Sequence, residues 1–216
     1  MNSVMNIRNM IVLMALSGAI NINAQRTVQV LKDGWNFSRG DVFSVANSQQ
    51  VRVPHDWAIY GPFDRKNDLQ VVAVEQNGER EATEKTGRTG GLPFIGKGVY
   101  RTTFEVPDTA NRSVTIVFDG VMSNAHVKLN GKEVISWPYG YNSFYVNVDG
   151  VILPGENQLE VGCENKNGQS RWYPGAGLYR NVHVVTTDKV HIPTWGTFVT
   201  TPVVTKEYAS VALSIE

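Results

Sequence analysis

The stretch AHVKLNGKEVI at residues 125–135 decides the fold class of this chain. Ala125, Val127 and Leu129 alternate with polar residues, as the buried face of a half-exposed β-strand does. Asn130-Gly131 follows, and apolar residues resume at Val134 and Ile135. Asn-Gly favours the two-residue turn of a β-hairpin because both central residues must adopt positive φ. The sequence therefore predicts two antiparallel strands joined at residues 130–131.

Similar period-two runs recur on both sides of this hairpin. Each has apolar residues on one face and ends at Gly, Pro, Asn or Asp, and no helical spacing of ten or more residues occurs after residue 25. We expect strands around Val28 and Val30, Val51 and Val53, Tyr100 to Val106, Val114 to Phe118, Phe144 to Val148, Leu159 to Cys163, and Val182 to Val184. Short strands separated by turns predict an all-β protein, a β-sandwich or jelly roll.

Composition excludes several classes of function. The chain has 216 residues, with 20 Lys and Arg against 20 Asp and Glu, so its formal net charge is zero. A balanced charge provides no electrostatic basis for binding nucleic acid or an anionic membrane. The single cysteine, Cys163, excludes an internal disulfide and a thiolate zinc cluster, and its place among apolar positions indicates a buried hydrophobe.

Residues 1–24 have the layout of a secretory signal peptide. Arg8 is followed by an apolar run from Met10 to Ile20 and then by a short polar stretch. Eleven residues are too few to span a bilayer, which needs about 20. We expect cleavage after Ala24 and a secreted or periplasmic protein; the alternative is a buried N-terminal helix.

Two regions break the strand pattern. Residues 62–98 are long, charged and rich in glycine, as a functional or disordered loop is, although Leu69 to Val74 could add a short strand. After Asp188 the pattern restarts, with expected strands at Trp195 to Thr201 and Val211 to Ile215. A two-stranded remnant is not stable alone, so we expect residues 189–216 to be the front of a further domain.

Chemistry-bearing residues are sparse. None of the four histidines sits at metal-ligand spacing, so we expect no metal, and His126 and His183 fall on the outward faces of strands. The segment 170–180, SRWYPGAGLYR, combines aromatic rings, arginines and glycines between two strands. Arg171, Trp172 and Tyr173 could bind a sugar, because C–H faces stack on aromatic rings and hydroxyl oxygens accept from guanidinium. For Gly177 and Leu178 we expect a packing role, and for Arg180 an internal ion pair.

Seven motifs occur in an order that resembles a known family. They are GWNF (34–37), VPHDW (53–57), TGGLP (89–93), YRTTF (100–104), DGV (119–121), LNG (129–131) and RWYPGAGLYR (171–180). The chain is similar to the N-terminal sugar-binding, galactose-binding-like jelly roll of glycoside hydrolase family 2 β-galactosidases, of the secreted Bacteroides-like type. The resemblance implies a signal peptide at 1–24, this jelly roll at 25–188, and the truncated beginning of an immunoglobulin-like β-sandwich at 189–216.

The resemblance also implies where the chemistry lies. In that family a later (β/α)8 barrel carries two catalytic glutamates of a retaining mechanism, with carboxyl groups roughly 5 Å apart. No residue of this chain matches either glutamate, so we expect no catalytic residue, no cofactor and no activity from the chain alone. The implied partners are the barrel of the parent chain and a β-galactoside.

One position departs from the family. Well-known members carry aspartate where this chain has Arg171. A cation there could donate to sugar oxygens or pair with a sulfate or uronate. Three alternatives remain open: a stand-alone carbohydrate-binding module, a structural spacer, and a parent of the β-glucuronidase type.

Overall fold

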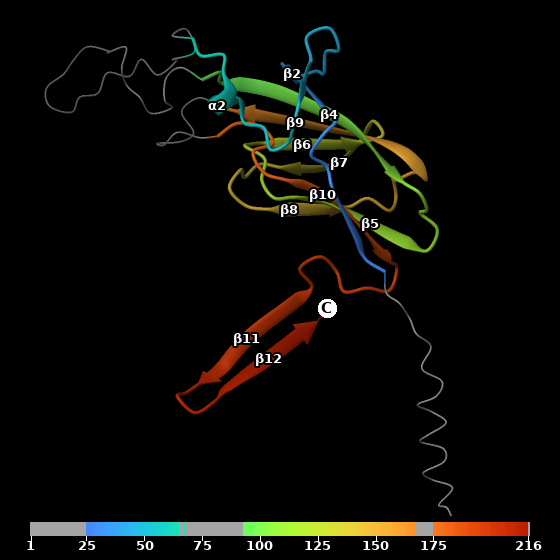
Figure 1. Cartoon of the computed structure of the whole chain (residues 1–216), viewed down its shortest axis with the longest axis vertical. Helices are drawn as coiled ribbons and strands as arrows, with labels where there is room; N and C mark the ends of the chain where they lie inside the picture. Colours follow the sequence, from blue (N-terminus) through green and yellow to red (C-terminus); the bar gives the residue numbers. More distant parts are fainter. Residues whose placement is uncertain (1–24, 65–66, 68–92, 167–174, 216) are drawn as a thin grey trace, which may run out of the picture.

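The chain folds as two antiparallel β-sheets packed face to face (Figure 1). The structure is a computed structural model and describes residues 25–64, 67, 93–166 and 175–215. One sheet has six strands in the order β3-β2-β4-β9-β6-β7, and the other has four in the order β1-β10-β5-β8. Their bounds are β1 Thr27–Val30, β2 Trp35–Arg39, β3 Gln49–Val51, β4 Gly96–Val106, β5 Arg112–Phe118, β6 Ala125–Leu129, β7 Lys132–Trp137, β8 Phe144–Asn147, β9 Gly155–Asn165 and β10 Val182–Asp188. The predicted all-β sandwich is confirmed.

The core lies between the two sheets and uses alternate residues of each strand. In β4, Tyr100, Thr102, Phe104 and Val106 are buried, as their spacing predicts. β9 lies beside β4 over their whole length and buries Leu159, Val161 and Cys163 on the same face. Buried and exposed residues alternate because the pleat of a strand directs successive side chains to opposite faces of the sheet.

The hairpin at residues 130–131 is also confirmed. Asn130 has φ of 52° and Gly131 of 80°, and β6 pairs antiparallel with β7 on either side. Positive φ at both central residues gives the turn a twist that matches that of the flanking strands.

β1 corrects one sequence expectation. Val28 and Val30 do form a strand, but their side chains are 51% and 40% exposed. β1 is the edge of the four-stranded sheet, and both valines lie opposite β10 residues, Val185 and His183. In β10 the core residues are Val182 and Val184, which alternate with His183 and Val185. Val28 and Val30 therefore lie on the outer face of the sheet.

The chain continues past β10 into a hairpin, with β11 Thr197–Val204 and β12 Ala209–Ile215 antiparallel. Both predicted strands exist, and their side chains are almost all exposed; β11 begins two residues later than expected because Trp195 adopts φ of 61°. The Trp195 ring meets that of Tyr145 in β8 edge to face, 5.0 Å between centroids. The immunoglobulin-like assignment of residues 189–216 and the signal peptide at 1–24, which lies outside the described residues, stay predictions.

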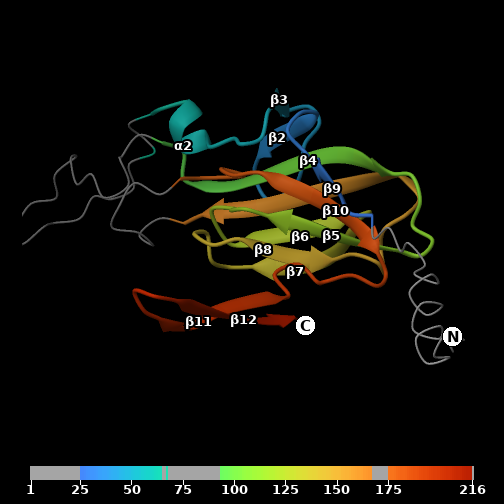
Figure 2. The ribbon, with the colours of Figure 1, turned by 60° about the horizontal axis from the view of Figure 1, so that its bottom comes forward.

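Helix is almost absent from the described ranges. The structure has α2, the single turn Trp57–Tyr60, at one end of the sandwich (Figure 2). Within those ranges no helix has the length and apolar character needed to cross a bilayer.

Candidate functional site

One end of the sandwich gathers the segments that flank the predicted sugar-binding residues. β4 begins there and β9 ends there, because Gly96 pairs with Asn165. β5 ends where β8 and β10 begin, because Phe118 pairs with both Phe144 and Val182. We call this the loop end; its described segments are residues 56–64, 93–95, 119–124, 138–143, 166 and 175–181. Arg171, Trp172 and Tyr173 lie outside the described residues, but the chain leaves β9 and returns at Gly175 at this end.

Asp56 fixes the returning segment. Its Oδ1 accepts from the backbone N–H of Ala58, capping α2, and from that of Ala176, each at 2.9 Å. Burial raises the pKa of the Asp56 carboxyl, and the two backbone hydrogen bonds, from Ala176 and Ala58, act against this rise. A Cβ at Gly175 would lie 2.7 Å from Asp56 Oδ2, so glycine allows the close approach. The segment that follows the predicted contact residues is thus attached to the helix N-terminus.

A second contact joins the same segment to the core. The N–H of His55 donates to the carbonyl of Leu178 at 2.8 Å, and the N–H groups of Met122 and Gly177 donate to each other's carbonyl oxygens at 3.0 and 2.9 Å. Leu178 is fully buried. The packing role predicted for Gly177 and Leu178 is confirmed.

His55 and Tyr100 form a buried polar pair beneath this segment. The Tyr100 hydroxyl lies 2.7 Å from His55 Nδ1, and the imidazole stacks on the ring of Tyr60 at 5.4 Å. Burial lowers the pKa of His55 from 6.5 to about 4, and burial raises the pKa of Tyr100 well above its usual value. The imidazole is therefore neutral at pH 7 and the phenol keeps its proton, so this pair supports the loop end rather than performing chemistry.

The expectation for Arg180 is wrong within the described residues. Arg180 is exposed, and no carboxylate there forms an ion pair with it. Its guanidinium instead lies 5.3 Å from the centroid of the Tyr179 ring. The face of the adjacent aromatic ring attracts the positive charge of the guanidinium.

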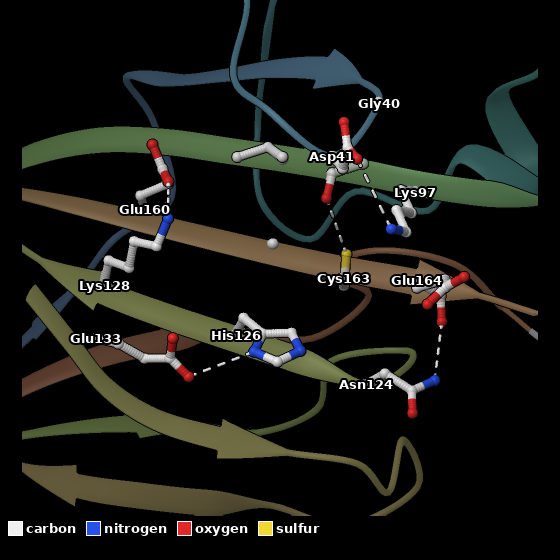
Figure 3. Close-up of a pocket in the computed structure, with 13 residues that line it drawn as sticks. Gly40, Asp41, Lys97, Asn124, His126, Lys128, Glu133, Glu160, Cys163 and Glu164 are labelled. Atoms are coloured by element: carbon white, nitrogen blue, oxygen red, sulfur yellow. Dashed lines mark hydrogen bonds and ion pairs between the residues drawn. The ribbon is translucent and has the colours of Figure 1, made fainter. Parts of the chain in front are cut away.

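A shallow groove of about 260 Å³ lies on the outer face of the six-stranded sheet (Figure 3). Gly162 leaves room in its floor, because no side chain projects from that position. Glu160 already pairs with Arg101 at 2.6 Å and Lys128 at 3.4 Å. Charges that are satisfied by one another offer little to an ionic ligand, so the groove is a weaker candidate than the loop end.

The titratable groups near this groove have structural surroundings. The thiol of Cys163 is fully buried, lies 3.7 Å from the carbonyl of Gly98, and burial raises its pKa, so the predicted role as a small hydrophobe is confirmed. His126 and His183 face outward as predicted, beside Glu133 at 3.4 Å and Asp119 at 2.9 Å. In the described part of the chain, no three His, Cys, Asp or Glu residues gather as metal ligands.

Residues 94–185 match the family described as "Glycosyl hydrolase 2 galactose-binding domain-like". Over these residues the β-sandwich thus matches a glycoside hydrolase family 2 galactose-binding-like domain. The matched residues run from just before β4 into β10.

Relatives with known names are several times longer than this chain. It is 35% identical over 190 residues to the β-galactosidase BoGH2A of Bacteroides ovatus, which covers 83% of this chain and 20% of that protein. It is 29% identical over 189 residues to a putative β-glucuronidase of Formosa agariphila, covering 87% of this chain and 16% of the relative. Among solved structures, a β-glycosidase from Bacteroides vulgatus matches with a TM-score of 0.71 at 30% identity, over 88% of this chain and 24% of that one. The chain therefore spans about one fifth of the length of the relatives it matches.

Sequence reasoning missed the residues that support the site. The motifs at residues 53–57 and 100–104 contain His55, Asp56 and Tyr100. The sequence analysis assigned none of these residues a role in the site. The signal was available for Asp56, since Asp directly before a short run that opens with Trp57 is a typical helix N-cap. Its second bond, to Ala176 120 residues away, depends on the tertiary fold.

Proposed function

We propose that this chain is the non-catalytic sugar-binding N-terminal domain of a family 2 β-galactosidase, which hydrolyses terminal β-galactosides in carbohydrate catabolism. One observation carries this proposal: the chain matches a galactose-binding-like domain and spans only one fifth of a named β-galactosidase. The catalytic partner would be a (β/α)8 domain of the same polypeptide. The domain's own role is to shape the subsite of the terminal sugar.

Within the domain, Arg171, Trp172 and Tyr173 are the proposed sugar contacts. The segment containing them runs between β9 and Gly175, where Asp56 holds the chain through Ala176. Fixed ends reduce the conformational entropy that a loop loses on binding, which favours sugar binding by the aromatic and guanidinium groups that this segment contains. This geometry favours a contact role over a purely structural spacer.

A β-glucuronidase parent is the second candidate. Two named relatives are β-glucuronidases: the putative enzyme of Formosa agariphila and one from Bacteroides fragilis that is 25% identical. Arg171 would favour such a substrate, because a guanidinium pairs with a uronate carboxylate in bidentate geometry.

For localisation we propose a secreted or periplasmic protein, released by cleavage after Ala24. The support is the charged start, the apolar run and the small residue at the cut site in residues 1–24. Sequencing the N-terminus of the exported protein tests this: residue Gln25 is expected first, and a start at Met1 would contradict it.

Arg171→Ala in the full-length enzyme tests the contact role. Losing one charged hydrogen bond of about 1.5–3 kcal/mol should lower kcat/KM by one to two decades. Assays on nitrophenyl β-galactoside and nitrophenyl β-glucuronide measure this and decide between the two parents by the preferred substrate.

The matched control is Arg52→Ala, since Arg52 is 70% exposed and forms only a surface pair with Asp33. It should leave kcat/KM unchanged, and neither variant should change the thermal midpoint appreciably. Unchanged kinetics with lost stability in Arg171→Ala would make the residue structural and overturn its proposed role.

A further inference from the structure

Exposed aromatic side chains of the sandwich are concentrated at the loop end. Tyr60, Phe63, Tyr139 and Tyr141 are there, each more than half exposed. The opposite end differs. Its described turns, at residues 107–111, 130–131 and 148–154, expose one large apolar side chain, Leu153, and no aromatic ring. Tyr145 is exposed on the outer face of β8, beside Trp195. An aromatic ring left in water gives up the free energy of burial, so a cluster of them at one end indicates binding.

Tyr139 and Tyr141 form the densest part of this cluster. Both belong to the connection between β7 and β8, and their ring centroids are 5.7 Å apart at an angle of 56°. The exposed fractions are 56% and 54%. Two inclined rings at this spacing make an open apolar surface about as wide as one or two sugar rings.

The connection is held in place by the structure around it. The carbonyl of Gly140, between the two tyrosines, accepts from the Tyr179 hydroxyl at 2.7 Å. The Met122 side chain fills the space where a Gly140 side chain would project. Trp137 Nε1 donates to Asn142 Oδ1 at 3.0 Å. The rings are therefore presented from an ordered backbone, which lowers the entropy cost of binding.

A guanidinium completes the surface. Arg180 lies over Tyr179, whose hydroxyl is bonded to the same connection. Burial raises the pKa of Tyr179, and the nearby charge of Arg180 opposes this rise. The Arg180 side chain is exposed, so it can reach a ligand at this end of the sandwich.

We infer that Tyr139 and Tyr141, with Arg180, form a carbohydrate-binding platform that contacts sugar units of the substrate beyond the terminal one. The inference rests on the proposed function and extends it from a single sugar to an oligosaccharide. Position supports the occupant, since Tyr179 and Arg180 continue the segment that returns from the proposed contacts at residues 171–173. Chemistry supports it as well: inclined aromatic faces bind sugar C–H groups, and guanidinium donates to hydroxyl oxygens.

The test measures binding of β-1,4-galactotriose and of methyl β-galactoside to the 216-residue chain by saturation-transfer NMR titration. The double variant Tyr139→Ala/Tyr141→Ala should weaken the dissociation constant for the trisaccharide about tenfold. Its dissociation constant for the monosaccharide should stay within twofold of that of the unaltered chain. Tyr145→Ala, which removes an exposed tyrosine of the strand β8 itself rather than of the β7–β8 connection, is the matched control and should change neither constant.

Two results would overturn the platform: a double variant that binds the trisaccharide as tightly as the unaltered chain, or an unaltered chain that shows no saturation transfer from it. Packing against a further domain is then the explanation for the exposed rings. Thermal unfolding of each variant excludes loss of fold as the cause. The proposed function has its own readout, since Arg171→Ala kinetics in the full-length enzyme can fail or succeed whichever way the trisaccharide behaves.

Discussion

At the scale of single residues, Gly177 is the position where the loop end is packed most tightly. Its φ is +97°, a conformation that residues with a Cβ rarely adopt. A Cβ there would collide with the Tyr100 hydroxyl and come within 3.0 Å of the His55 carbonyl oxygen. Neither neighbour can move freely, because the hydroxyl is bonded to His55 and both residues are buried.

We therefore predict that Gly177→Ala lowers the free energy of unfolding by about 2–4 kcal/mol. Denaturant titration measures the change. Gly150→Ala is the control, since no atom lies within 4 Å of the position of its Cβ, and it should be close to neutral. Equal stability of the two variants would show that the backbone at Gly177 tolerates a side chain.

His55 predicts a pH dependence of stability. Its folded pKa is about 4, below the value of 6.5 for a solvated histidine, because burial disfavours the charged form. Between these values the unfolded chain binds a proton that the folded chain does not. Stability is thus full above pH 6.5 and falls as the pH drops towards 4, by up to about 1.4 kcal/mol per pH unit and on the order of 3 kcal/mol in all.

Unfolding midpoints at pH 7.5 and 5.0 measure this, with His55→Asn as the comparison. The variant should be less stable at pH 7.5 and should lose less between the two pH values. Asp56 acts in the opposite direction, since its raised pKa stabilises the fold as the pH falls, but both proteins contain it. A slope unaffected by the substitution would contradict the assignment of a neutral buried imidazole.

At the scale of elements, the start of β9 shows how one polar side chain can extend a strand. Residues 154–157, PGEN, have the composition of a turn, but β9 already begins at Gly155, opposite Val106. Asn157 is 1% exposed, and its Nδ2 donates to the carbonyls of Leu153 and Gly155 at 2.8 and 3.0 Å. Its Oδ1 accepts from the N–H of Leu153 and from Asn130, both at 2.8 Å. The Asn157 side chain thus forms the hydrogen bonds that hold the chain before β9. The strand can therefore begin directly after Pro154.

Asn157→Ala should cost about 2–3 kcal/mol, because it leaves several buried donors and acceptors without partners. Thermal or denaturant unfolding measures it. The adjacent Gln158→Ala removes an exposed side chain and should be nearly neutral. If Asn157→Ala is also neutral, the side-chain bonds are not what holds this end of β9.

Element prediction succeeded where one face alternates and the turn chemistry is specific. β4 and β6 were predictable for this reason, and the Asn130-Gly131 turn, which needs positive φ, located the start of β7. β2 was not expected as a strand, because its buried residues Trp35, Phe37 and Ser38 do not alternate strictly. Ser38 is covered from outside, where its hydroxyl accepts from the N–H of Ser44. The loop after β2 covers Ser38, and the spacing of apolar residues within a strand does not show that a loop packs on it.

At the scale of the whole molecule, the candidate site was predictable only in outline. Residue chemistry indicated a contact segment near residues 171–173, and the structure brings the ends of that segment to α2 and to the β7–β8 connection. The tyrosines of that connection carried no signal, because single tyrosines between strands are common in core and surface alike. Only the fold shows that Gly140, Tyr179 and Arg180 meet there.

We propose that this chain binds sugar for a catalytic domain elsewhere in the protein and has no glycosidase activity itself. The most direct test is to assay the purified 216-residue chain on nitrophenyl β-galactoside and nitrophenyl β-glucuronide, with the full-length enzyme as the positive control. We expect release of nitrophenol by the full-length enzyme and none above background by the chain. Turnover that rises in proportion to the concentration of the 216-residue chain would contradict it.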